Sequence, residues 1–169
     1  PAVDARAYDQ IAQNIVFGNG FREQGLEVPI LFDRSIQRAG PAYEYFLAGL
    51  YEVFGHHYEA VWILQVLLHA LSAGLLWLIA RRVFGERGAV AGLVAAVIFG
   101  FHPDLIEISA MLMTETLYLF FIILTMYVFV LVYDNTRSWW YAILLGLILG
   151  AGLLSRPTAS PEIGFRIPW

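Results

Sequence analysis

The sequence predicts an all-α, polytopic membrane protein: a bundle of about four transmembrane helices, preceded by an external N-terminal loop containing short interfacial helices. Of the 169 residues, 59% are hydrophobic and only 14% are charged, whereas soluble domains carry about 25% charged residues. The charges are also unevenly placed, because few lie between residues 88 and 133 and most of the rest lie in the first sixty. Four long apolar stretches between residues 61 and 155 therefore need a bilayer around them.

The elements can be expected in order along the chain. Residues 1–58 form the external loop, which is polar and irregular to about residue 40, although Ala7, Ile11 and Ile15 begin it with helical spacing before Gly18. The segment "PAYEYFLAGLYEVFG" has a proline that fits a helix start and a glycine that fits its stop. It is too short and too charged to span, so a helix lying in the interface plane is expected.

Residues 59–156 form the predicted transmembrane bundle. Its apolar stretches run from about 59 to 83, from 88 to about 100, from about 112 to 133 and from about 139 to 154. The second stretch is shorter and carries Gly88, Gly92, Ala96 and Gly100 at four-residue spacing, which lets helix backbones approach closely. Residues 157–169 are expected to be an external or disordered tail.

Arginine placement predicts the orientation of these spans. The turn "ARRVFGERG" holds three arginines close to span ends, whereas the turn "HPDLIEIS" holds none. The positive-inside rule puts the first turn in the cytoplasm, and therefore puts the N-terminal loop outside.

Composition excludes several classes of function. The net charge of −4 gives no sign of a nucleic-acid partner, which would need a clustered basic face, and the absence of cysteine excludes disulfides and thiolate metal sites. No P-loop, G-x-G-x-x-G, G-x-S-x-G or H-E-x-x-H motif is present. A chain that starts at Pro1 rather than at methionine is expected to be a piece of a longer protein.

Glu115 is the leading candidate for chemistry, because it lies one turn inside the third span. An intramembrane carboxylate costs roughly 2.5–3.5 kcal/mol to insert and needs a partner, a proton, a metal or a wet cavity. Asp4 and Asp9 lie on the same external side, but by spacing alone they read as helix caps or solvated charges. Arg38 could hold an anion or pair with Glu44 or Asp33.

Other polar residues favour structural roles. Gln65, His69 and Ser72 share one face of the first span and predict interhelical hydrogen bonds. The spacing of His102, Asp104 and Glu107 is not a specific metal-ligand pattern, so a solvated loop is expected. His56 and His57 mark the entrance of a span.

Seven segments, in order, carry a resemblance. They are "DARAYDQIAQNI", "GNGF", "RAGPAYEYFLAGLYEVFG", "WILQVLLHAL", "ARRVFGERGA", "FHPDLIEISAMLMTETLYLF" and "GLILGAGLLSRPTA". Together they resemble the N-terminal part of a GT-C superfamily glycosyltransferase, in the branch of the dolichyl-phosphate-mannose protein mannosyltransferases and bacterial aminoarabinose transferases. The resemblance covers about residues 3–159. Family members run to several hundred residues, so this chain is expected to be a fragment.

The resemblance implies roles for the matching positions. Asp4 matches the catalytic carboxylate of the first external loop, and Glu115 matches a second acidic position facing the same cavity. Arg38 and Tyr43 fall in a stretch near the donor phosphate, although "RAGPAYEYF" matches it loosely, and Arg156 matches an arginine at the external end of a later span. The resemblance also allows a divalent metal (Mg²⁺, Mn²⁺ or Zn²⁺) at Asp4 and Glu115.

The activity that this resemblance implies is transfer of a sugar, with inversion, from a polyprenyl-phosphate-linked donor. The acceptor is a protein, a lipid or a glycan, and the reaction takes place at the outer face of a prokaryotic inner or plasma membrane. Two alternatives remain open: a non-catalytic membrane scaffold or assembly subunit, and a small transporter that uses Glu115 with Gln65 and His69 as a polar pathway.

Overall fold

The computed structural model describes residues 2–29, 33, 35, 41–134 and 139–155, and all the regular secondary structure in this part of the chain is helical. The side chains of Ala2, Val3, Asp4 and Asp134 lie outside this description. The elements in order are α1 (Ala2–Val16), α2 (Ala42–Phe54), α3 (Tyr58–Phe84), the 3₁₀ turn η3 (Gly85–Arg87), α4 (Gly88–Gly100), α5 (Pro103–Ser109), α6 (Thr114–Asp134) and α7 (Trp139–Ser155). The predicted all-α class is confirmed.

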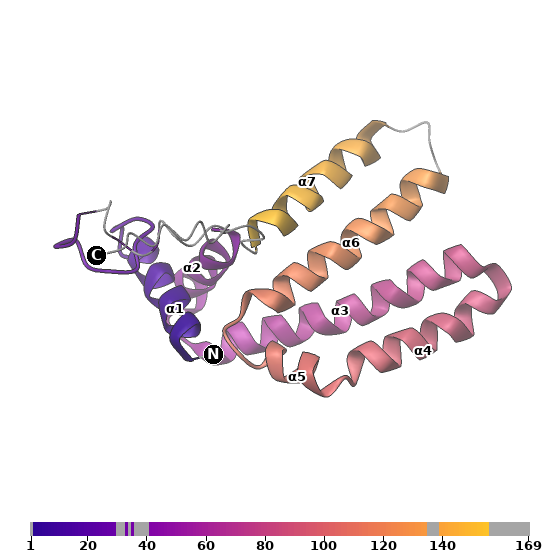
Figure 1. Ribbon diagram of the computed structural model, residues 1–169, viewed down its shortest axis with the longest axis horizontal. Helices are drawn as coiled ribbons and strands as arrows, with labels where there is room; N and C mark the ends of the chain where they lie inside the picture. The colour runs from indigo at the N-terminus through magenta and orange to yellow at the C-terminus, as the bar shows by residue number, and fades with distance from the viewer. Residues whose placement is uncertain (1, 30–32, 34, 36–40, 135–138, 156–169) are drawn as a thin grey trace, which may run out of the picture.

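Four apolar helices lie side by side in the order α7, α6, α3, α4, with α1 and α2 gathered at one end (Figure 1). Because this arrangement is a single layer, large apolar side chains point outward from every one of the four helices. Ile63, Val94, Phe129 and Leu147 are between 52% and 67% exposed. A continuous exposed apolar surface of this kind is expected to face lipid.

Two helical stretches are long and apolar enough to cross a bilayer: Tyr58–Gly100, which folds back at η3, and Thr114–Tyr133. With 27 residues, α3 is about 40 Å long. By contrast, α4 and α7 have 13 and 17 residues, fewer than the roughly 20 that a straight crossing needs. The four predicted apolar helices are thus present, and two of them, α3 and α6, are long enough for a straight crossing.

Close backbone packing holds α3 against α4. A Cβ atom added to Gly92 would lie 2.8 Å from the carbonyl oxygen of Trp77, and one added to Gly88 would meet the backbone of Ala80 and Arg81. The predicted role of these two glycines in close helix approach is therefore confirmed. Gly146 and Gly150 of α7 are also four residues apart but are not used in this way, since a Cβ atom added to either would meet nothing within 4 Å.

Helices α1 and α2 pack over the N-terminal ends of α3 and α6. Tyr43 and Leu47 of α2, Ala12 of α1, Val61 of α3 and Leu117 of α6 belong to one buried cluster. The predicted helix α2 is confirmed, with Pro41 before it and Gly55 at its end. The cluster fixes how α1 and α2 pack on the bundle, because burial of these apolar side chains is the main favourable contribution to folding.

The expected helical start of the N-terminal segment is confirmed: α1 is a regular helix of 15 residues that contains Ala7, Ile11 and Ile15 and ends before Gly18 (φ 78°). The expectation for the segment after α4 was wrong. The segment expected to be a solvated loop forms the short helix α5, because Pro103 both ends α4 and occupies a first-turn position of the next helix. His102, Asp104 and Glu107 are nevertheless exposed, as expected.

Candidate active site

Glu115 lies in the first turn of α6, where the helix dipole favours a negative charge. Its side chain is half-buried and accepts a hydrogen bond from Thr114 Oγ1 at 3.3 Å. The turn that leads into it, residues 110–113, is held from α3: Gln65 Nε2 donates to the carbonyl oxygens of Met111 at 3.0 Å and Met113 at 3.4 Å. The backbone that presents Glu115 is therefore fixed by a buried amide.

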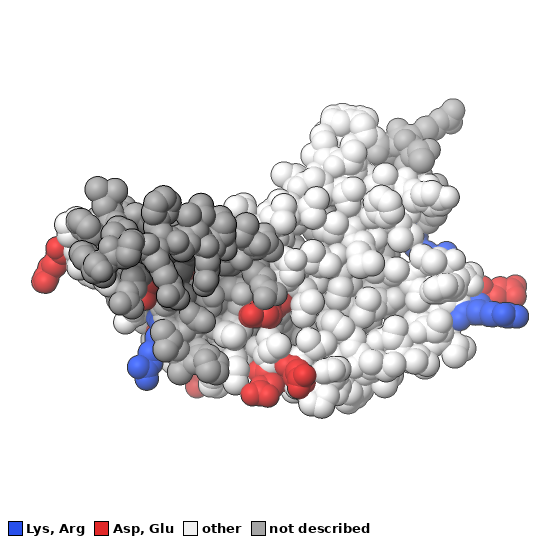
Figure 2. All heavy atoms as spheres, viewed as in Figure 1, with Lys and Arg blue, Asp and Glu red and all other residues white. Residues whose placement is uncertain are grey.

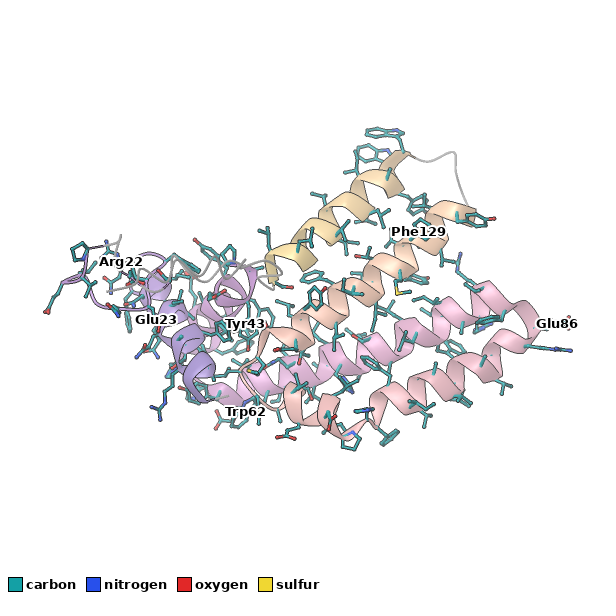
Figure 3. The ribbon with its side chains drawn as sticks, in the orientation of Figure 1. Arg22, Glu23, Tyr43, Trp62, Glu86 and Phe129 are labelled. Atoms are coloured by element: carbon teal, nitrogen blue, oxygen red, sulfur yellow. The ribbon has the colours of Figure 1, made fainter. Side chains whose placement is uncertain are left out.

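Tyr43 is fully buried where α2 meets the bundle (Figure 3). Its ring contacts the Tyr8 ring edge to face, with centroids 5.4 Å apart. Burial first, then the nearby Tyr8, Glu115 and Glu44, raise the pKa of Tyr43 far above its ordinary value, although the backbone N–H of Met113 acts in the opposite direction. Tyr43 and Glu115, which lie far apart in sequence, are thus brought together, and the phenol stays protonated.

A second acidic side chain belongs to this neighbourhood. Glu44 is 1% exposed and acts electrostatically on Tyr43 together with Glu115. The sequence pattern suggested Glu44 only as a partner for Arg38. Its burial could not be read from the helix periodicity, because the glutamate interrupts an otherwise apolar stripe.

Asp4 lies on α1, and its side chain is outside the described part of the chain. The adjacent residue Ala5 lines a hollow of about 390 Å³ together with Tyr58, Trp62 and residues 110–113. The segment that bears Asp4 therefore borders the turn that leads to Glu115. Figure 3 shows Trp62 at the foot of α3, on the side of this hollow. Arg38, Arg156 and the tail at 157–169 lie outside the described residues.

Asp9 holds α1 in place. Its Oδ1 accepts hydrogen bonds from the hydroxyl of Tyr51 at 2.7 Å and from His56 Nε2 at 2.8 Å. Its Oδ2 accepts from the hydroxyl of Tyr58 at 2.9 Å and from Gln13 Nε2 at 2.9 Å. We call these five residues the Asp9 clamp. Because its members come from α1, α2, the α2–α3 connection and α3, the clamp sets the position of the helix that carries Asp4.

The clamp was not foreseen from the sequence, which offered Asp9 only as a cap or a solvated charge. Burial first, then the hydrogen bond and the charge of Asp9, raise the pKa of Tyr51 well above its usual range. Its hydroxyl is therefore a permanent donor. No spacing rule could have joined Asp9 to Tyr51 and Tyr58, because they are separated by 42 and 49 residues.

We call Gln65, His69 and Ser72 of α3 the polar stripe. The hydrogen bonds predicted from this stripe to other segments are confirmed for two of the three side chains. Gln65 bonds to the turn before α6, and His69 Nε2 is 3.3 Å from the carbonyl oxygen of Gly100 on α4. The expectation for Ser72 was wrong, because its hydroxyl donates to the carbonyl of Leu68 in its own helix at 2.8 Å. A serine inside a helix commonly bonds back in this way.

The predicted metal position at Asp4 and Glu115 stays a prediction, because the Asp4 side chain lies outside the described residues. Among the side chains that the structure describes, no group of three or more histidine, aspartate or glutamate residues is placed to hold a metal ion. Protein sites for Mg²⁺ or Zn²⁺ usually combine several such ligands.

Comparison with known families identifies the chain. Residues 38–162 match the family described as dolichyl-phosphate-mannose-protein mannosyltransferase. The match extends over most of the chain, from before α2 to beyond α7. The protein therefore belongs to this family of GT-C-type membrane glycosyltransferases, and the helices long enough to cross a bilayer agree with an integral membrane protein. No curated protein and no solved structure matches it significantly.

Proposed function

We propose that the chain transfers a sugar from a polyprenyl-phosphate-linked donor to a hydroxyl group of a protein, lipid or glycan acceptor. The observation that carries the proposal is the hollow lined by Ala5 and residues 110–113, which brings the surroundings of Asp4 and Glu115 together at one end of the bundle. Family membership supports the reaction class. The expected site is the external face of a prokaryotic inner or plasma membrane.

The chemistry is a single displacement at the anomeric carbon. Asp4 takes the proton of the acceptor hydroxyl, whose oxygen forms the new bond to that carbon. The bond from the carbon to the phosphate oxygen breaks, and its electron pair leaves with the lipid phosphate. The configuration therefore inverts. Arg38 and Arg156 are proposed to stabilise the charge that builds on the phosphate.

Glu115 and Tyr43 have different tasks in this proposal. Glu115, which lies in the first turn of α6 directly after the turn that lines the hollow, is proposed to orient the acceptor. Tyr43, whose pKa is raised mainly by burial, donates a hydrogen bond rather than accepting a proton.

The transporter alternative receives no support from the contacts of the polar stripe. Gln65, His69 and Ser72 all bond to backbone carbonyl oxygens, so their side chains are engaged in the fold. The hollow between α3, α6 and α7 is lined by apolar residues apart from Thr125, whose hydroxyl donates to the carbonyl of Phe121. A scaffold without chemistry is separated from the enzyme by the following assay.

The test measures sugar transfer in membranes that contain the protein, with a radiolabelled sugar on a polyprenyl phosphate as the donor. Asp4→Asn and Glu115→Gln should each lower transfer at least 100-fold, because general-base catalysis contributes about 10²–10⁴-fold. Asp104→Asn and Glu107→Gln, which change exposed carboxylates on α5, should retain it. Full transfer by Asp4→Asn protein would exclude the proposed base.

A further inference from the structure

The far end of the α3–α4 hairpin carries a basic cluster. Arg81 and Arg82 close α3, and Arg87 closes η3, with Glu86 as the acidic residue among them. All four side chains are exposed. Figure 2 shows these charges at the tip of the hairpin, next to an uncharged surface over the middle of the bundle, and Figure 3 labels Glu86 there.

Arg81 is held in a defined place within this cluster. Its Cζ atom lies 4.5 Å from the centroid of the Trp77 ring, one helical turn earlier. The tryptophan is itself fixed, since a Cβ atom on Gly92 would be 3.0 Å from Trp77 Cδ1. In the described part of the chain, no carboxylate lies within ion-pair distance of Arg81. The guanidinium group is thus preorganised and available to an anion.

An apolar groove begins at Leu78, on the N-terminal side of Arg81 along α3. A hollow of about 460 Å³ runs along the outer face of α3, lined by Leu67, Leu71, Gly74, Leu75, Trp77 and Leu78. The hollow is open at Gly74, where an added Cβ atom would meet nothing within 4 Å. From Leu67 to Leu78 the helix rises about 16 Å, which is about half of the 30 Å hydrocarbon core. The groove therefore matches the depth of one leaflet.

We propose that Arg81, Trp77 and this groove bind one anionic phospholipid. The phosphate contacts the Arg81 guanidinium, with Arg87 adding to the positive potential, and one acyl chain lies in the groove past Gly74. Charge complementarity selects the headgroup, and a tryptophan at the interface suits this depth. Arg81 and Trp77 lie near the end of α3 that is opposite α1 and α2 (Figure 1), so binding of the headgroup does not require the proposed sugar-transfer site.

The test is native mass spectrometry of the purified protein titrated with phosphatidylglycerol or phosphatidylcholine of identical chains. The parent protein should bind phosphatidylglycerol more tightly. Arg81→Gln should weaken that binding about fivefold, since one arginine near a lipid surface contributes about 1 kcal/mol. Arg6→Gln, which removes an exposed arginine from α1, is the matched control and should bind like the parent.

A second variant tests the groove. Gly74→Leu adds a side chain into open space, so it should fold normally, and it should weaken both lipids while leaving the preference for phosphatidylglycerol. Excess inorganic phosphate should not compete. The proposal is overturned if Arg81→Gln and Arg6→Gln behave alike, if Gly74→Leu binds both lipids unchanged, or if phosphate ions displace the lipid.

Discussion

Replacing Asp9 with alanine should detach α1 from α2 and α3. The side chain is 13% exposed and accepts four hydrogen bonds, one of them from Tyr51, which is 5% exposed. Removing the carboxylate leaves the buried Tyr51 hydroxyl without its acceptor, which costs about 1–3 kcal/mol. The bond from His56, a side chain that is 43% exposed, adds little. A net loss of about 2 kcal/mol is expected.

Trypsin offers a local assay, because Arg6 lies on α1. Under conditions where opening is fast, cleavage follows the population of the open form, and about 2 kcal/mol corresponds to about a thirtyfold faster cut at Arg6. Asp9→Asn retains one acceptor oxygen and should show a smaller increase. Arg87 lies in the exposed turn at the tip of the α3–α4 hairpin, far from the Asp9 clamp, so cleavage there is the reference and should not change.

Tyr51→Phe completes a double-mutant cycle with Asp9→Ala. It should accelerate cleavage at Arg6 in the parent protein but have little further effect in the Asp9→Ala protein, because the two side chains share one interaction. The reasoning is refuted if Asp9→Ala leaves the Arg6 cleavage rate unchanged, or if the Arg6 and Arg87 sites accelerate together.

Three further changes test the fold. Asp33 is 2% exposed. Burial raises the pKa of its carboxyl group, but hydrogen bonds from Ser35 and the backbone outweigh burial and lower the pKa from 3.8 to about 2. The ionised carboxylate therefore contributes about 2 kcal/mol to the free energy of unfolding, which is present above pH 4 and lost as the pH falls to 2. Thermal unfolding of Asp33→Asn protein should therefore differ from the parent at pH 6 and converge with it near pH 2; a constant difference would contradict the assignment. Gln65→Leu should cost about 1 kcal/mol in thermal unfolding and exceed Ser72→Ala, whose hydroxyl bonds only within its own helix; equal losses would remove Gln65 from its supporting role. Because the chain has no cysteine, an impermeant maleimide applied to intact cells should label Gln10→Cys but not Glu86→Cys, and the reverse pattern would invert the orientation.

The apolar helices could be predicted closely because hydrophobic length is a local property. The observed α6 and α7 begin within two residues of their predicted starts. Pro41 and Gly55 likewise marked the limits of α2. Each of these signals is contained in the segment that it describes, so tertiary packing does not override it.

The contacts that build the candidate site could not be predicted in this way. Asp9 bonds to Tyr51 and Tyr58 only because α1 packs on α2 and both helices pack against the N-terminal end of α3. The burial of Glu44 depends on the same packing. The Ser72 prediction failed because a shared helix face shows which side chains point inward but not whether a hydroxyl bonds across to a neighbour or back to its own carbonyls.

The glycine contacts between α3 and α4 bear on how the chain enters the membrane. With 13 residues, α4 is about 20 Å long, so it cannot reach across the hydrocarbon core by itself. Its Gly92 nevertheless lies flush against the Trp77 backbone, which means that the two helices have no room for lipid between them. We expect α3 and α4 to insert into the membrane together as a preformed hairpin, because the shorter α4 depends on its contact with α3 to stay in the hydrocarbon core.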